Sequence, residues 1–306
     1  MSEHFNMKSR EDAIVYLNGE YCQAKEAHIS PFDHGLLYGD GAYDTATAKD
    51  GVVFILDEHI ERFNRSARAL DIDIPLSNEE LKEAIVETVK RNNLKDAYIK
   101  WLVTRGDGEP FVSPWLCEKP TLLILARGLQ KTDTKQPQKG SEATIVSTRR
   151  IPPMCGIEPR IKQLNYLNHV MMYMEARAAG ADEAIALDIN GYVSEFATAN
   201  LFIVKDDEIY TPPSLNILEG TTRKIIIEIA NDLGRKIDES LMTPYDLFTA
   251  DEIFSTATAS GGGLIPIVKV DGRKIGDGKP GNVFKELKKV YLEMLGNEEF
   301  GVSIYK

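Results

Sequence analysis

The first half of the chain alternates apolar and polar residues in short runs, a pattern that predicts β-strands. Two of the junctions between runs are Asn18-Gly19 and Asp50-Gly51, and both pairs readily adopt the two positive φ angles of a type I′ turn. Each junction therefore predicts a β-hairpin. The strands expected in this half are 14–17, 20–22, 43–48, 52–56, 97–104 and 121–126.

Two helices are predicted between residues 57 and 92, where apolar residues recur every three or four positions. Asp57 is expected to cap the first helix. Ser77 and Glu80 have the spacing of a capping box, which predicts that the second helix begins there and runs to about Asn92. The first half thus combines a sheet with two helices.

A polar segment, residues 130–140, interrupts these patterns; it contains a proline and shows no periodicity. Such a segment is typical of a linker between domains. We therefore expect a small N-terminal domain over residues 11–129 and a larger C-terminal domain over residues 141–306.

The second half of the chain is expected to be rich in sheet. Strands are predicted at 143–147, 184–188, 192–196, 201–204 and 208–210, and helices at 165–179, 221–233 and 282–295. Gly234 directly follows the second of these helices, as a C′ glycine does. The fold class is therefore a two-domain, mixed α/β (α+β) protein without a simple alternation of strand and helix.

Composition narrows the classes of function. The 306 residues carry a net charge of −11, which argues against a nucleic-acid surface built from clustered lysine and arginine. There is no run of about 18 apolar residues to span a membrane, and the polar N-terminus lacks the apolar stretch of a signal peptide. Cys22, Cys117 and Cys155 form no Cys-x-x-Cys pair, and the five histidines lack metal-ligand spacing. We therefore expect a cytoplasmic protein with reduced thiols and no metal centre.

Two residues could carry chemistry, although each has an ordinary alternative. Lys162 stands between a loop containing proline and glycine and a predicted helix, with apolar neighbours on both sides. It is either a surface lysine or a desolvated amine, and because buried lysines are rare, composition alone favours the surface. Glu195 lies in a predicted strand, either on the solvent face or facing a pocket, where it would need a cationic partner.

Three further features could bind an anion or approach a ligand. Gly220-Thr221-Thr222 opens the helix 221–233, whose free N–H groups suit a phosphate, although an ordinary threonine cap is the commoner alternative. Arg62 is either a member of a surface ion pair or a cationic clamp. The run of small residues 255–263 ends in three glycines and is either a flexible turn or a place where backbone approaches a ligand.

Seven segments occur in the order found in one enzyme family. They are PFDHGLLYGDGAYD (31–44), DEHIERF (57–63), AYIKWLVTRG (97–106), IKQLNYLN (161–168), EAIALDINGYVSEFATANLF (183–202), LEGTTR (218–223) and DGRKIGDG (271–278). On these segments the chain, from about Ile14 to Gly278, resembles the class IV aminotransferases: branched-chain amino-acid aminotransferases, D-amino-acid aminotransferases and (R)-selective amine transaminases.

The resemblance implies a fold, a cofactor and an activity. The fold-type-IV architecture has a small N-terminal α/β domain and a larger C-terminal, sheet-rich domain, with pyridoxal 5'-phosphate between them. The implied reaction moves an amino group between an amino acid or (R)-amine and a 2-oxo acid. The implied assembly is a homodimer or a higher homo-oligomer.

The same resemblance implies roles for individual residues. Lys162 matches the lysine that binds the cofactor as a Schiff base and shuttles a proton, and Glu195 matches the carboxylate that keeps the pyridine nitrogen protonated. The other cofactor contacts implied are Arg62, Thr221 and Thr222 at the phosphate, Thr258 at phosphate and substrate, and Tyr166 near the ring oxygen. The substrate contacts expected are Tyr43, Tyr98, Lys100, Thr258 and Ala259.

The substrate is left open, because the chain departs from the family patterns. Thr47 stands where branched-chain enzymes usually carry arginine, and Lys100 stands where they carry the arginine of Tyr-x-Arg. Thr104-Arg105-Gly106 is not followed by the Arg-x-His of D-amino-acid enzymes. Since a substrate carboxylate needs charge-assisted donors, Lys100 or Arg105 is expected to bind it. Aminodeoxychorismate lyase, which shares this fold, is the alternative, although Tyr166 replaces its usual basic residue.

Overall fold

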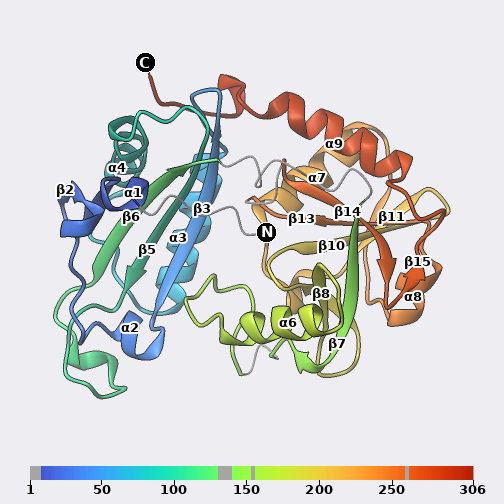
Figure 1. Cartoon of the computed structure of the whole chain (residues 1–306), viewed down its shortest axis with the longest axis horizontal. Helices are drawn as coiled ribbons and strands as arrows, with labels where there is room; N and C mark the ends of the chain where they lie inside the picture. The colour runs from blue at the N-terminus through green and yellow to red at the C-terminus, as the bar shows by residue number, and fades with distance from the viewer. Residues whose placement is uncertain (1–7, 130–139, 153–155, 259–261, 306) are drawn as a thin grey trace. The chain divides into compact units, whose positions relative to one another are not determined.

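The computed structural model describes residues 8–129, 140–152, 156–258 and 262–305. Within these ranges the chain forms two compact units. The first contains 8–129, 161–165 and 295–305, and the second contains 140–152, 156–160, 166–258 and 262–294. Both units contain sheet and helices (Figure 1). No helix in the described ranges is long and apolar enough to cross a membrane.

The first unit is built on a seven-stranded antiparallel sheet with the strand order β16-β4-β3-β5-β6-β1-β2. Its strands are β1 (Ile14–Leu17), β2 (Glu20–Gln23), β3 (Gly41–Lys49), β4 (Val52–Phe54), β5 (Ala97–Thr104), β6 (Thr121–Gly128) and β16 (Gly301–Ser303). Its α-helices are α1 (Lys8–Glu11), α2 (His34–Tyr38), α3 (Leu56–Ala69) and α4 (Asn78–Arg91). The sequence did not predict α1, α2 and β16, which are too short to show a period.

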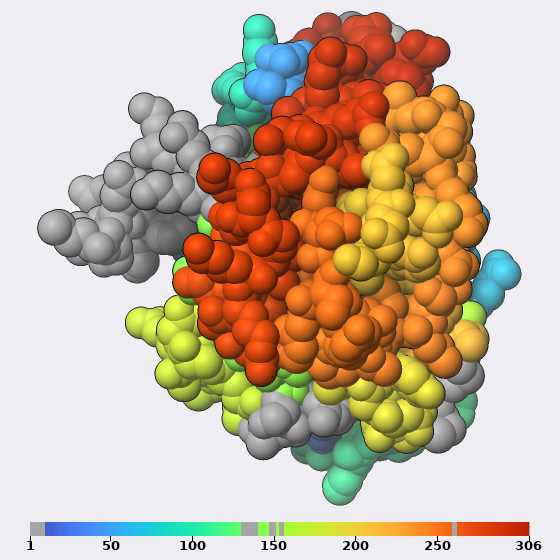
Figure 2. All heavy atoms as spheres, turned by 90° about the vertical axis from the view of Figure 1, so that its right-hand side faces the viewer, coloured from blue at the N-terminus to red at the C-terminus, as the bar shows by residue number. Residues whose placement is uncertain are grey.

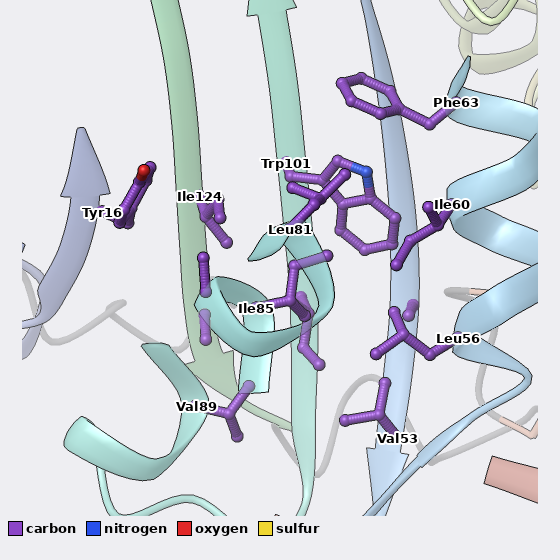
Figure 3. Packing of buried hydrophobic residues seen from close by; sticks show 14 of the residues in the cluster. Tyr16, Val53, Leu56, Ile60, Phe63, Leu81, Ile85, Val89, Trp101 and Ile124 are labelled. Atoms are coloured by element: carbon purple, nitrogen blue, oxygen red, sulfur yellow. The ribbon is translucent and has the colours of Figure 1, made fainter. Parts of the chain in front are cut away.

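The core of the first unit lies between one face of this sheet and helices α3 and α4 (Figure 3). Alternate residues of β5, namely Ala97, Ile99, Trp101 and Val103, are fully buried on that face. Phe63 of α3 packs edge-to-face on Trp101, with ring centroids 6.2 Å apart. Because side chains alternate along a strand, the intervening residues of β3 and β5 lie on the opposite face of the sheet.

Both predicted hairpins are confirmed. The turn residues of Asn18-Gly19 and Asp50-Gly51 all adopt positive φ angles, between 49° and 104°. The capping box is confirmed as well, since Ser77 Oγ accepts the N–H of Glu80 (3.3 Å) and Glu80 Oε2 accepts the N–H of Ser77 (2.8 Å). These features depend on neighbouring residues only, which is why the sequence predicts them.

The predicted cap at Asp57 is wrong. Strand β4 ends two residues earlier than expected, and Ile55 is the N-cap of α3, in the left-handed region at φ 40°. The N–H of Ile55 donates to Phe300 O (2.8 Å), and its carbonyl accepts the N–H of His59 (3.3 Å). The chain therefore turns from strand to helix within one residue, and the tertiary bond to Phe300 satisfies the N–H of that residue. Asp57 lies in the first turn, where its charge is favourable to the helix dipole.

The second unit is built on a nine-stranded mixed sheet with the order β12-β11-β10-β13-β14-β7-β8-β9, and β15 pairs with β14. Its strands are β7 (Ser141–Arg150), β8 (Glu183–Leu187), β9 (Val193–Phe196), β10 (Asn200–Lys205), β11 (Glu208–Thr211), β12 (Ile237–Glu239), β13 (Glu252–Thr256), β14 (Leu264–Val270) and β15 (Arg273–Lys274). Its helices are α6 (Leu167–Ala178), α7 (Thr221–Asp232), α8 (Pro244–Thr249) and α9 (Asn282–Met294).

The sequence predicted some of the elements that position the site in this unit and missed others. Helix α7 ends as expected, since Gly234 adopts φ 72° and donates to Asn231 O (2.9 Å), and Arg235 N–H reaches Ala230 O (2.9 Å) in a Schellman motif. Strands β13 and β14 were not predicted, because the small residues 255–263 conceal the end of β13.

Candidate functional site

Lys162 lies in a segment, residues 161–165, that runs beside the start of β3 in the first unit. The N–H of Tyr43 donates to Lys162 O (2.9 Å), and the N–H of Lys162 donates to Ser66 Oγ of α3 (3.0 Å). The residue is only 9% exposed, so the surface alternative is wrong. A buried ammonium loses hydration, so a buried lysine is uncommon in proteins and indicates a specific role.

The ring of Tyr43 lies close to two lysine amines. Its centroid is 4.6 Å from Lys162 Nζ and 4.2 Å from Lys100 Nζ, both of which are cation–π distances. Tyr98 pairs with Thr47 across β3 and β5, so it shares with Lys100 and Tyr43 the sheet face opposite the core. Burial lowers the pKa of Lys100. The structure therefore brings Lys162 and the three predicted substrate residues of this unit to one region.

The core face of β3 carries a buried ionic network that holds Arg62. The Nε–H and Nη2–H of Arg62 donate to the two oxygens of Asp44 (2.8 and 2.7 Å). His59 Nδ1 lies 2.9 Å from Asp44 Oδ1 and must donate to it, because a carboxylate only accepts. Burial alone would raise the pKa of the Asp44 carboxyl, but Arg62 and His59 hold it well below its ordinary value. Burial lowers the pKa of His59, which is therefore neutral at pH 7.

Arg62 is thus a buried cation, and the surface ion-pair alternative is wrong. Arg105, in contrast, is fixed by structural contacts. Its guanidinium donates to Asp40 Oδ2 (2.9 Å) and to the carbonyls of Leu70 and Asp71 (2.6 Å each). These bonds engage all three of its nitrogens, which leaves Lys100 as the candidate for a substrate carboxylate.

Glu195 of β9, in the second unit, is 6% exposed, so the solvent-face alternative is wrong. All four residues of β9 are buried, and the expected alternation is absent. Glu195 Oε2 accepts the N–H of Leu218 (3.1 Å) and an Nδ2–H of Asn200 (3.2 Å). Asn200 also donates to Leu218 O (2.8 Å). Glu195 is therefore tied to the segment that leads directly into α7.

The N-terminus of α7 offers polar atoms that lack partners within the described residues. Its N-cap is Gly220 without a side-chain cap bond, so the threonine-cap alternative is wrong. The buried hydroxyl of Thr221 has no hydrogen-bond partner there, and neither has that of Thr256 at the end of β13. Thr222 Oγ1 lies 3.5 Å from Thr258 Oγ1. Because buried polar atoms without partners are costly and a helix start favours anions, this arrangement fits an anionic ligand.

Two predicted contacts remain. Tyr166 is the N-cap residue of α6, which begins two residues later than expected, and its ring stacks on His169 with centroids 4.5 Å apart. Ala259 lies outside the described residues.

Sequence reasoning missed Asp44 and Asn200. A signal for Asp44 exists, because it stands in an alternate row of β3 with Ala42, Ala46 and Ala48, and all four side chains are fully buried. An acid in a row of small apolar residues indicates a buried partner. Asn200 has no comparable local signal, since its contact with Glu195 depends on strand pairing.

Comparison with known proteins gives a consistent result. Residues 41–270 match the family described as amino-transferase class IV. A Methanocaldococcus jannaschii protein provisionally named a branched-chain-amino-acid aminotransferase is 42% identical over 292 residues, which cover 95% of this chain and 99% of the relative. The branched-chain-amino-acid aminotransferase of Escherichia coli K12 is 32% identical over 298 residues, covering 95% of this chain and 96% of the relative.

Comparison with solved structures finds the same family of enzymes. The crystal structure of a branched-chain amino acid aminotransferase from the archaeon Thermoproteus uzoniensis with norvaline matches with a TM-score of 0.87 at 33% identity, covering 95% of this chain and 99% of that one. Another branched-chain amino acid aminotransferase, crystallised in complex with N-(5'-phosphopyridoxyl)-L-glutamate, matches with a TM-score of 0.90 at 34% identity. That match covers 96% of this chain and 99% of the other. The mixed α/β fold that the sequence resemblance implied is therefore confirmed.

Proposed function

Because the chain belongs to the class IV aminotransferase family, we propose that it is a pyridoxal-phosphate-dependent branched-chain amino acid aminotransferase. It moves the amino group of a branched-chain L-amino acid to a 2-oxo acid. The observation that carries the proposal is Lys162, a buried lysine whose amine lies against the ring of Tyr43, a ring that the half-buried amine of Lys100 also contacts. The relatives named above support the choice of branched-chain substrates.

The residues present fit pyridoxal phosphate. When bound, this cofactor supplies an aldehyde that reacts with primary amines and a pyridine ring that accepts electrons. Lys162 Nζ holds the cofactor and then carries a proton to and from the substrate Cα. Glu195 keeps the pyridine nitrogen protonated, and its bonds to Leu218 and Asn200 fix the direction of the carboxylate.

The phosphate is assigned to the start of α7. Thr221 supplies a buried hydroxyl that has no partner among the described residues. Thr222 and Thr258 supply their own hydroxyls, whose oxygens lie 3.5 Å from each other. The family resemblance assigns Arg62 to the phosphate as its positive charge, and Asp44 fixes the plane of the Arg62 guanidinium. Tyr166 is assigned to the ring oxygen of the cofactor, because of its place in the motif IKQLNYLN.

The substrate is assigned to the sheet face of the first unit that carries Tyr43, Tyr98 and Lys100, together with Thr258 and Ala259. The aromatic rings suit a branched aliphatic side chain, because both are apolar. Lys100 suits a carboxylate, since its ammonium has no acidic partner among the residues that the structure describes.

Visible absorption of the purified protein tests the proposal. L-leucine is expected to convert the cofactor's visible band to that of pyridoxamine phosphate, and a 2-oxo acid is expected to restore it. Conversion by D-alanine or (R)-1-phenylethylamine but not by L-leucine would assign the chain to another branch of the family. A protein that acquires no visible band in excess cofactor contradicts the proposal altogether.

Lys100→Met is expected to raise KM for L-leucine by about 10- to 100-fold, because a hydrogen bond to a charged group contributes about 1.5–3 kcal/mol. Lys100→Arg should retain most of the affinity. Burial lowers the pKa of Lys100, so KM should rise with increasing pH as the ammonium loses its proton, earlier than an exposed lysine would. Steady-state kinetics across pH checks this, with a neutral amine donor as control. Equal effects on both donors contradict the assignment.

We further infer that the protein is a homodimer or a higher homo-oligomer. Two segments of the first unit, 29–37 and 111–116, expose large apolar side chains, including Leu36, Phe111 and Trp115. The segments belong to one surface, because His34 Nε2 contacts the Glu109 carbonyl (2.9 Å) next to the second of them. Contiguous exposed apolar residues indicate a protein interface, and a second copy is the partner that the family resemblance implies.

Trp115→Glu is expected to weaken self-association by about 30-fold or more, because a central aromatic residue contributes about 2 kcal/mol or more to an interface. Sedimentation equilibrium checks this against the monomer mass of 34.2 kDa. Tyr245→Glu, at an equally exposed aromatic residue of α8, is the control and should leave the mass unchanged. A wild-type protein of 34.2 kDa at micromolar concentration contradicts the inference.

A cytoplasmic location is also part of the proposal. It is supported by Cys22 and Cys117, which are free thiols. Free cysteines are usual in a reducing compartment.

A further inference from the structure

Helix α9 lies on the surface of the second unit (Figure 2) and packs against α7. Its start is fixed by Glu252 of β13, whose carboxylate accepts the N–H groups of Val283 (3.0 Å) and Phe284 (2.9 Å). A carboxylate at a helix N-terminus satisfies free donors and favours the helix dipole. Helix α9 is therefore held in a fixed position relative to β13, the strand that ends two residues before Thr258.

The last turn of α9 places Tyr291 against Gly263, which lies just after the undescribed residues 259–261. Tyr291 is 2% exposed. A Cβ atom added to Gly263, which has φ +79°, would lie 2.3 Å from the Tyr291 ring and 2.9 Å from its hydroxyl. The N–H of Ala257 donates to Gly263 O (2.9 Å), so the two ends of this loop are joined. Gly263 is thus required by the close approach of Tyr291, a role that neither alternative for the glycine run anticipated.

The hydroxyl of Tyr291 continues this contact into α7. It is hydrogen-bonded to the side chain of Thr222, and burial raises the pKa of Tyr291 to about 12. The phenol therefore keeps its proton at every physiological pH. Thr222 Oγ1 in turn lies 3.5 Å from Thr258 Oγ1. Tyr291 thus contacts both Gly263 and the side chain of Thr222 at the start of α7.

We propose that Tyr291 is a positioning residue for the phosphate: its hydroxyl orients Thr222, and its ring packs on Gly263, whose carbonyl accepts the N–H of Ala257, the neighbour of Thr258. The proposal rests on the assignment of Thr222 and Thr258 to the cofactor phosphate. A threonine hydroxyl rotates freely unless a partner restrains it. Because Tyr291 is buried and anchored in α9, it restrains Thr222 before the ligand arrives, which lowers the entropic cost of binding.

Tyr291→Phe tests the role of the hydroxyl, because it keeps the ring that packs on Gly263. In equilibrium dialysis of the full chain, the affinity for pyridoxal phosphate should fall about 3- to 10-fold, the equivalent of one hydrogen bond. The affinity for pyridoxal, which lacks the phosphate, should stay unchanged. The ³¹P resonance of the bound cofactor should shift as well. Tyr173→Phe is the control, since it removes a hydroxyl that bonds Thr198 of the same unit.

A double-mutant cycle separates positioning from packing. In a Thr222→Val background, Tyr291→Phe should cause no further loss of affinity, since the hydroxyl acts through Thr222. Additive losses, an unchanged affinity for pyridoxal phosphate, or equal losses for pyridoxal would each overturn the role. A wild-type protein that binds no pyridoxal phosphate would instead refute the proposed function, and the role of Tyr291 with it.

Discussion

Lys162→Ala is expected to abolish amino transfer, with kcat lower by about 10⁴-fold or more, and to remove the visible band of the bound cofactor. The variant loses both the amine that holds the cofactor and the group that carries the proton, and general acid–base catalysis alone contributes about 10²- to 10⁴-fold. Absorption spectra and stopped-flow kinetics with L-leucine measure the two losses separately.

The fold should survive this change, because removing a buried amine also removes its cost of desolvation. Circular dichroism and thermal unfolding should therefore match the wild type. Lys236→Ala is a suitable control, since it removes an amine whose side chain is 68% exposed and should retain the band. A Lys162→Ala protein with the wild-type spectrum would show that another amine holds the cofactor.

Asp44→Asn is expected to lower the free energy of unfolding by about 3–5 kcal/mol, because it removes the buried carboxylate that pairs with the buried guanidinium of Arg62. Urea unfolding measures this loss. Glu61→Gln is the matched control, since it removes a carboxylate that pairs with Arg65 on the same helix but is exposed. An exposed pair contributes less than about 1 kcal/mol.

The pH dependence of stability gives a second test of Asp44. Its pKa in the folded protein lies below the unfolded value of about 3.9. The stabilisation by this carboxylate is therefore fully present above about pH 5 and is lost as the pH falls towards the lowered pKa. The difference between wild type and Asp44→Asn should shrink in acid. A difference under about 1 kcal/mol at pH 7 would contradict the importance of the network.

The sequence predicted those parts of the fold that depend on neighbouring residues. Asn18-Gly19 and the Ser77–Glu80 pair carry their own turn or cap chemistry, so their hairpin and helix start could be placed to the residue. Ile55 could not be predicted as a cap, because its left-handed conformation follows from a bond to Phe300, 245 positions away in the chain. At this helix start, a tertiary contact and not the local sequence determines which residue is the N-cap.

In the candidate site, too, some features could be predicted from the sequence and others depend on tertiary contacts. Lys162 and Glu195 were identified through motifs, while their own surroundings in sequence favoured solvent for both. Burial of Glu195 follows from β9, which is buried on both faces, so a two-residue period carries no information there. Asp44 and Tyr291 act through contacts with α3 and α7, which only the folded chain brings close.

The backbone hydrogen bond between Lys162 and Tyr43 of β3 also restricts the movement of the Lys162 amine. The peptide groups on both sides of this lysine are tied, one to Tyr43 and one to Ser66, so its Cα is a fixed pivot. All movement of Nζ must then come from torsions of the four-carbon stem. Nζ can therefore change position by side-chain torsions while both backbone hydrogen bonds stay in place.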